Sequence, residues 1–140
     1  MKTPIAVEEA VARIADGMTV MVGGFLGVGS PHRLIDEVVR QEKRALTLVS
    51  NDTMRPGQGV GKLIDAGCVK RVVASHIGTN PVTQKKMIDG EIEVELVPQG
   101  TLAERIRAAG YGLGGVLTPT GLGTRAAEGK PTLDVEGRTY

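Results

Sequence analysis

The sequence is poor in aromatic residues: its 140 residues include one Phe, two Tyr and no Trp. A hydrophobic core must therefore be built almost entirely from Val, Ile, Leu, Met and Ala. The chain also has a single cysteine, Cys68, which excludes an intrachain disulfide bond and is typical of a reducing compartment. Because Cys68 precedes an apolar run, we expect it to be an inert residue of the core.

Charge of one sign is not concentrated anywhere in the sequence. The 17 Lys and Arg residues and the 16 Asp and Glu residues are spread along the chain, and the formal net charge is +1. A basic stripe that would bind nucleic acid or an anionic membrane surface is missing, so neither partner is expected. The sequence also lacks an apolar run of about 20 residues and the apolar segment of a signal peptide. These features predict a cytoplasmic protein.

Glycine, by contrast, is abundant. The 20 Gly residues indicate several tight loops that approach one another or a ligand. A chain of 140 residues is predicted to form one domain, 1–140. Residues 132–140 alternate like a strand around the turn Glu136-Gly137, with a short second arm. We therefore expect this domain to be the N-terminal portion of a longer polypeptide.

Short apolar runs alternate with amphipathic segments along the chain. Ser30 is expected to cap one helix, Asn80-Pro81 opens another, and Thr101 with Glu104 resembles a capping box. The alternation predicts an α/β fold with an open, mostly parallel sheet flanked by helices. Strands are predicted over 19–22, 46–49, 69–74 and 92–96, and Glu91, Glu93 and Glu95 are expected on a solvated face. Helices are predicted over 7–15, 58–66 and 80–88, and two further helices are expected to follow Ser30-Pro31 and Thr101.

Polar and glycine-rich segments follow the strands of the predicted sheet. In an open α/β sheet such segments meet at the carboxyl ends of the strands, where ligands bind. Their Gly, Ser, Thr, Asn and Gln residues offer neutral hydrogen-bond donors, which suit carbonyl, carboxylate or phosphate oxygens. The segments are 23–31, 50–53, 75–80, 98–101 and 118–124.

Several common catalytic motifs are missing from these segments. The loop with Gly27 and Gly29 has His32 where a dinucleotide-binding G-x-G-x-x-G motif needs glycine, and no Lys follows Gly29 as in a P-loop. His32 and His76 are not spaced as a metal-binding pair, so no metal site is expected. No serine lies in a G-x-S-x-G elbow. We interpret an edge that is rich in donors but has no nucleophile as half of an active site.

The same segments form a series of motifs that runs through nearly the whole chain. The motifs are Asp16-Gly17 followed by Gly23-Gly24-Phe25-x-x-x-Gly29-x-Pro31, then Ser50-Asn51-Asp52, Ser75-His76-Ile77-Gly78-Thr79-Asn80, Pro98-Gln99-Gly100-Thr101 and Thr118-Pro119-Thr120-Gly121. With these motifs, the sequence resembles the alpha chains of the 3-oxoacid CoA-transferase family. The Ser75–Asn80 motif is more similar to the bacterial acetate and butyrate–acetoacetate enzymes than to other branches.

The resemblance implies the fold shared by CoA-transferases and some sugar-phosphate isomerases, together with an activity. Family members move CoA between a short-chain acyl-CoA, such as acetoacetyl-, acetyl- or butyryl-CoA, and a free carboxylate by a ping-pong route. The nucleophilic glutamate, which carries the anhydride and thioester intermediates, belongs to the beta subunit. The resemblance thus implies a beta-subunit partner, commonly in an alpha2beta2 assembly, and coenzyme A as the substrate, with no tightly bound cofactor.

The resemblance also implies roles for residues of this chain. Gln99, between a strand and the capping box, is implied as the amide donor that stabilises the oxyanion of the tetrahedral intermediate. His76 could act as a general base or only shape the pocket, and Asn51 could contact substrate or form a local turn. The residues expected to bind CoA or substrate are Gly23, Gly24, Phe25, Leu26, Gly27, Val28, Gly29, Asn51 and His76.

Other interpretations of the same residues stay open. The alpha subunit of a 3-oxoadipate or succinyl-CoA:3-oxoacid CoA-transferase belongs to the same family. A non-catalytic small-molecule-binding module could use the same fold. An isomerase or hydrolase on this fold would need its own Lys or carboxylate at the strand ends, where the sequence offers only Asp52.

Overall fold

The structure, a computed structural model, describes residues 3–140, which form two compact units. The first unit ends at Glu95, and the second comprises Leu96–Tyr140. The prediction of a single domain over 1–140 stays a prediction.

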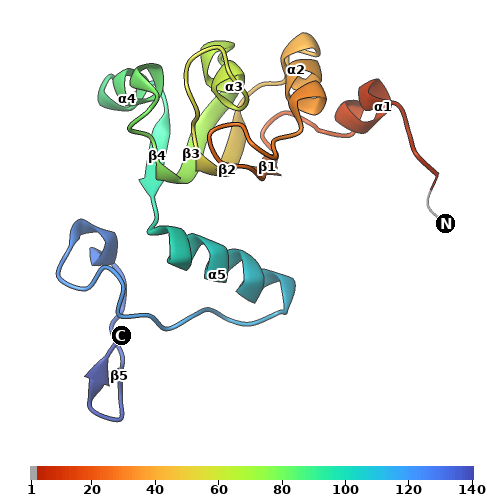
Figure 1. Cartoon of the computed structure of the whole chain (residues 1–140). Coiled ribbons are helices and arrows are strands. Elements are labelled where there is room, and N and C mark those ends of the chain that lie inside the picture. The colour runs from red at the N-terminus through yellow and green to blue at the C-terminus, as the bar shows by residue number, and fades with distance from the viewer. Residues whose placement is uncertain (1–2) are drawn as a thin grey trace. The chain divides into compact units, whose positions relative to one another are not determined.

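The first unit is an α/β layer in which strands and helices alternate. Neighbouring strands are consecutive in the sequence, in the order β1-β2-β3-β4, and β2 is parallel to both β1 and β3. Figure 1 shows α2, α3 and α4 on the same side of this sheet. The fold class predicted from the sequence is therefore confirmed. The elements are α1 (Val7–Ala12), β1 (Thr19–Val22), α2 (His32–Arg40), β2 (Leu46–Asp52), α3 (Gly61–Asp65), β3 (Val69–His76), α4 (Pro81–Ile88) and β4 (Glu93–Leu96).

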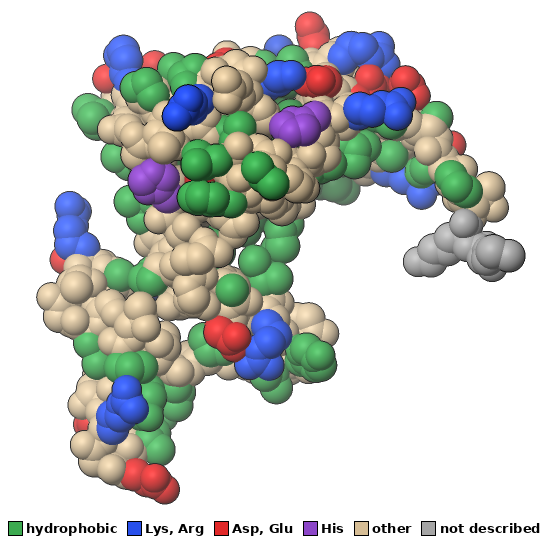
Figure 2. All heavy atoms as spheres, in the orientation of Figure 1, with side chains coloured by type: hydrophobic (Ala, Val, Ile, Leu, Met, Phe, Trp, Pro, Cys, Tyr) green, Lys and Arg blue, Asp and Glu red, His purple; other side chains and the backbone are tan. Residues whose placement is uncertain are grey.

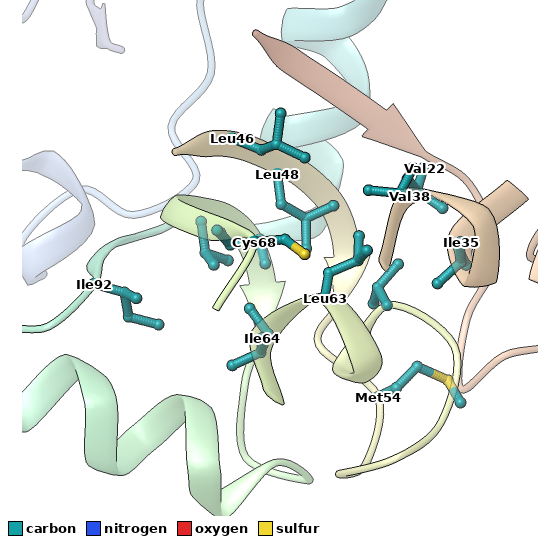
Figure 3. Packing of buried hydrophobic residues seen from close by; sticks show 14 of the residues in the cluster. Val22, Ile35, Val38, Leu46, Leu48, Met54, Leu63, Ile64, Cys68 and Ile92 are labelled. Atoms are coloured by element: carbon teal, nitrogen blue, oxygen red, sulfur yellow. The ribbon is translucent and has the colours of Figure 1, made fainter. Parts of the chain in front are cut away.

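The core of this unit lies between the sheet and its helices. Along β2 every second side chain, from Leu46 to Asp52, is buried, since successive residues of a strand point to opposite faces. The core is aliphatic, as the composition predicts, and Cys68 is packed inside it (Figure 3). Its members include Leu46 and Leu48 from β2, Ile35 and Val38 from α2, and Leu63 and Ile64 from α3.

Both central strands run further than the hydrophobic pattern predicts. β2 continues to Asp52 and β3 continues to His76, and these two residues are paired in the ladder. The helix predicted over 58–66 begins only at Gly61. Gly57 and Gly59, which lie before this start, have positive φ angles of 72° and 45°. These angles are incompatible with a right-handed helix, so the helix cannot begin earlier.

Two predicted helix caps are wrong. The hydroxyl of Ser30 donates to the carbonyl of Gly23 at 3.1 Å instead of capping α2, which begins at His32 after Pro31. The capping box does not form because α5 (Gln99–Gly110) begins directly after Pro98, which places Thr101 inside the first turn. Glu104 instead forms an ion pair with Arg107.

The structure also shows the predicted cap of α4 and the predicted acidic residues near β4. The side-chain oxygen of Asn80 accepts hydrogen bonds from the N–H groups of Val82 and Thr83, both at 3.1 Å, so the predicted start of α4 is confirmed. Glu91 and Glu93 are exposed, as predicted, whereas Glu95 is half-buried, and all three carboxylates form ion pairs. Arg71 bridges Glu93 and Glu95 at 3.2 and 2.9 Å, and Lys86 pairs with Glu91 at 2.7 Å.

The second unit contains α5, a short 3-10 helix over Arg125–Ala127, and the hairpin formed by β5 (Asp134–Val135) and β6 (Arg138–Thr139). The hairpin turns at Glu136 and Gly137, whose φ angles are 51° and 78°, as the turn signal predicts. None of the helices in residues 3–140 has the length and apolar character needed to cross a membrane.

We predict that Ile64→Ala lowers the free energy of unfolding by about 2–5 kcal/mol, because it leaves a cavity in the core. Ile64 is 1% exposed in α3, whereas Ile88, at the end of α4, is 78% exposed. The matched variant Ile88→Ala should change stability by less than about 0.5 kcal/mol. Denaturant titration of both variants tests the assignment of the core, and equal losses would contradict it.

Candidate functional site

Three polar segments of the first unit meet at the carboxyl ends of β1, β2 and β3. The side-chain amide of Asn51, at the end of β2, donates to the carbonyl of Gly24 at 2.7 Å. From β3, the hydroxyl of Ser75 donates to the carbonyl of Asn51 at 2.8 Å. The segments 23–31, 50–53 and 75–80 are therefore joined, as the sequence predicts. The segments 98–101 and 118–124 lie in the second unit, and their convergence on this edge stays a prediction.

The segment after β1, residues 23–29, forms the glycine-rich loop, whose tip is a very short hairpin. Phe25 and Val28 exchange two backbone hydrogen bonds, of 3.1 and 3.0 Å. The two residues between them, Leu26 and Gly27, both have positive φ angles, 45° and 82°. This combination is that of a type I′ turn, which normally carries Asn or Gly at its first central position.

Two glycines of the loop allow it to pack closely. A Cβ on Gly24, whose φ is +103°, would lie 2.4 Å from the Ser30 hydroxyl. A Cβ on Gly27 would lie 2.6 Å from the terminal methyl of Met54, a buried residue that follows β2. At Gly24 the added Cβ would also lie 2.8 Å from the backbone N of Ser30 and the carbonyl of Val28, so this position requires glycine. At Gly27 the Met54 methyl could move aside, and it is the positive φ of 82° that favours glycine.

Four side chains bind the backbone of the glycine-rich loop. Besides Ser30 and Asn51, the Nε2 atom of His32 lies 3.0 Å from the carbonyl of Gly27, and the carboxylate of Asp52 accepts the N–H of Leu26 at 2.9 Å. Of these four, only Asn51 is among the predicted site residues. A carboxylate within the polar segment that follows an apolar run is the signal that could have identified Asp52.

The segment that follows β3 forms hydrogen bonds to the backbone of the segment that follows β2. The hydroxyl of Thr79 donates to the carbonyl of Met54 at 2.9 Å. The side-chain amide of Asn80 donates to the carbonyl of Thr53 at 2.8 Å, and both residues are fully buried. The edge of the sheet is therefore a continuous hydrogen-bonded framework beneath the glycine-rich loop.

The tip of the loop exposes apolar side chains to solvent. Phe25, Leu26 and Val28 are 55%, 42% and 81% exposed. Leu26 and Val28 line an open hollow of about 400 Å³, together with His32 and Met54. Figure 2 shows hydrophobic side chains gathered on this face of the unit, between the two histidines. An apolar surface of this kind, surrounded by polar groups, is typical of a contact site.

The other predicted site residues have different surroundings. His76 is exposed at the end of β3, and its ring packs against Gly78, where a Cβ would lie 2.7 Å from the imidazole. Gln99 is the first residue of α5 in the second unit, so its predicted place before a capping box is wrong. The roles of both residues stay predictions.

Cys68 is completely buried in the core, as expected. Burial raises the pKa of its thiol above the ordinary value, and a protonated, inaccessible thiol is a poor nucleophile. In residues 3–140, no group of three His, Cys, Asp or Glu side chains is arranged to hold a metal ion.

Residues 5–140 match the protein-family model described as Coenzyme A transferase. The acetate CoA-transferase subunit alpha of Escherichia coli K12 is 53% identical over 141 residues, which is 100% of this chain and 64% of that protein. The acetoacetyl-CoA:acetate/butyrate CoA transferase alpha subunit of Clostridium acetobutylicum is 56% identical over 125 residues, covering 89% and 57%. The chain thus spans about three fifths of the length of these curated relatives. Subunits named for 3-oxoadipate or succinyl-CoA:3-ketoacid transfer match at 39–46% identity.

Solved structures resemble the chain as well. The apoenzyme of the acyl-CoA transferase YdiF from Escherichia coli O157:H7 superposes with a TM-score of 0.83, at 22% identity, over 97% of this chain and 31% of that one. A variant of the decarboxylase AibA/AibB superposes with a TM-score of 0.80, at 28% identity, over 96% and 55%. The first likeness shows the fold alone.

We predict that Gly24→Ala lowers the free energy of unfolding by about 1–3 kcal/mol, because a non-glycine residue there is strained and its Cβ collides with Ser30. Gly23 is a matched control: a Cβ on it would meet nothing within 4 Å, and its φ is not positive. Gly23→Ala should change the stability by less than about 0.5 kcal/mol. Equal denaturation midpoints for the two variants would show that the loop does not have the described conformation.

Proposed function

The chain belongs to the coenzyme A transferase family, and from this membership we propose that it forms the alpha subunit, or part of it, of a heteromeric short-chain acyl-CoA transferase. In this proposal the subunit binds acyl-CoA and a carboxylate substrate at the edge of its sheet. The beta subunit supplies the nucleophilic glutamate and carries the anhydride and CoA thioester.

One observation of the structure supports the proposal that the nucleophile comes from the other subunit. Among the residues that the structure describes, Asp52 has the only carboxylate at the carboxyl ends of β1–β3, and it is 2% exposed and bonded to the Leu26 N–H. A buried carboxylate that is already engaged by a backbone donor is poorly placed to attack a thioester. In the proposal, the edge therefore supplies surface and donors, and the attacking group comes from the beta subunit.

The glycine-rich loop supports the proposed binding of acyl-CoA. Gly24 and Gly27 let its backbone pack closely, and its tip exposes Phe25, Leu26 and Val28, of which Leu26 and Val28 line an open hollow. Apolar side chains suit the acyl and pantetheine parts of the substrate, and a few convergent polar groups suit its carbonyl oxygens. Asn51 then serves both as an anchor of the loop and as a neighbour of the bound substrate.

The position of Gln99 supports its proposed role in oxyanion stabilisation. It is the first residue of α5, a helix of 12 residues, where the helix dipole is positive. A neutral amide donor at a helix N-terminus stabilises negative charge that develops on a carbonyl oxygen without forming an ion pair with the attacking carboxylate.

The proposed substrates follow the relatives of higher identity. Those relatives are named for acetate and for acetoacetyl-CoA with acetate or butyrate, at 53% and 56% identity. We therefore propose exchange of CoA between acetoacetyl-CoA or another short acyl-CoA and acetate or butyrate. Transfer to 3-oxoadipate or from succinyl-CoA is the alternative within the family.

We predict that the subunit transfers CoA from acetoacetyl-CoA to acetate only when it is mixed with its beta subunit. The acetoacetyl-CoA absorbance should fall, and acetyl-CoA should appear at a rate that depends on both subunits. Turnover by this chain alone would contradict the proposal. Binding of acyl-CoA without transfer in the mixed preparation would favour a non-catalytic binding module.

In the assembled enzyme, Gln99→Ala should lower kcat by about 10²–10³, the usual effect of removing one oxyanion donor. Subunit assembly, followed by size-exclusion chromatography, should not change. Gln41→Ala is the control, because it removes the same amide from the end of α2, where the amide bonds to Glu37 and to the carbonyl of Glu8. An unchanged kcat for Gln99→Ala would remove this residue from the mechanism.

A further inference from the structure

Asp52 is a buried charged group that the proposed chemistry does not use. Its side chain is 2% exposed, and no Lys, Arg or His within residues 3–140 forms an ion pair with it. Burial of an unpaired carboxylate is unfavourable, so it persists only where hydrogen bonds compensate. The compensating donor is the backbone N–H of Leu26, 2.9 Å from Oδ2.

Leu26 is itself in an unfavourable conformation. Its φ of 45° lies in the left-handed region, which β-carbon sterics disfavour for all residues except glycine and, to a lesser degree, Asn and Asp. A type I′ turn prefers Asn-Gly, and here the pair is Leu26-Gly27. The turn thus keeps an apolar side chain at its tip at the expense of backbone strain.

The last two residues of β2 counteract this strain from opposite faces of the strand. Asp52 accepts from Leu26, and Asn51 donates to Gly24, 2.7 Å away. The strand end that carries both residues is fixed as well, because the hydroxyl of Ser75 donates to the Asn51 carbonyl and the hydroxyl of Ser50 donates to the Asp52 carbonyl, at 2.8 and 2.6 Å. The bond to the carboxylate is charge-assisted, the stronger kind of hydrogen bond.

We propose that Asp52 is a positioning residue: its carboxylate holds Leu26 in the left-handed turn and thereby fixes the apolar tip Phe25–Val28 for contact with the acyl-CoA substrate. The role in substrate contact rests on the proposed function, whereas the role in holding the turn does not. Asp52 acts through the loop and takes no part in the bond-making steps.

Hydrogen exchange of the assembled enzyme, followed by mass spectrometry, tests the holding of the turn. In Asp52→Ala the amides of residues 24–28 should exchange about 10- to 100-fold faster, which corresponds to the loss of a hydrogen bond to a charged group. Asp52→Asn should stay within about threefold of the wild type, because its amide oxygen can accept the same N–H. Equal rates in Asp52→Ala and wild type, or equal acceleration in both variants, would overturn the proposal.

A second substitution separates a specific role of Asp52 from a general loss of structure. Adding Leu26→Asn to Asp52→Ala creates the dipeptide that type I′ turns favour, so protection of residues 24–28 should recover at least in part. No recovery would mean that Asp52 acts on the core and not on the turn. If Asp52→Ala does not fold, Leu26→Asn alone should slow exchange of the loop, and unchanged or faster exchange would overturn the proposal.

Steady-state kinetics tests the link to the substrate. Asp52→Ala should raise the KM for acyl-CoA about tenfold or more while kcat changes less, because a mobile tip weakens binding more than the chemical step. Asp52→Asn should restore the KM. If loop exchange is faster but the KM for acyl-CoA is unchanged, the role in acyl-CoA contact is overturned, whereas the role of Asp52 in holding the turn stands. A wild-type enzyme without transfer activity would overturn the proposed function instead.

Discussion

The site depends on hydrogen bonds between the end of β2 and the backbone of the glycine-rich loop. A loop with this many glycines has a large conformational entropy, and its backbone hydrogen bonds close the hairpin at Phe25 and Val28 and the turn from Gly27 to Ser30. Asn51 and Asp52 fix it at two further points, and the Ser75, Thr79 and Asn80 side chains fix the β2 segment in turn. A flexible segment thereby becomes a surface of defined shape, which binding sites require.

Much of the fold follows from the hydrophobic pattern. The alternation of apolar runs with amphipathic segments predicts the parallel sheet, and Asn80-Pro81 predicts the start of α4 correctly. The pattern fails where polar residues belong to regular structure. Ser50, Asn51 and Asp52 look like a loop, but they are the end of β2, because ladder pairing with β3 continues to His76. The role of Ser30 is missed for a similar reason, since its hydroxyl donates to a carbonyl seven residues away in sequence, which local capping rules do not consider.

The fold by itself does not determine the reaction, since a decarboxylase shares it with a TM-score of 0.80 at 28% identity. The proposed transferase function rests instead on family membership and on the chemistry of the sheet edge. That edge has backbone and amide donors, an apolar tip and one buried carboxylate that already has a partner. In the proposal, a site of this composition binds and polarises a thioester, and the nucleophile comes from the beta subunit.

The location of covalently bound CoA tests this account most directly. The assembled enzyme would be incubated with acyl-CoA without an acceptor, and the separated subunits analysed by mass spectrometry and peptide mapping. The account predicts a CoA thioester on a glutamate of the beta subunit and an unmodified chain over residues 1–140. A CoA or acyl adduct on any carboxylate of this chain, Asp52 included, would contradict it.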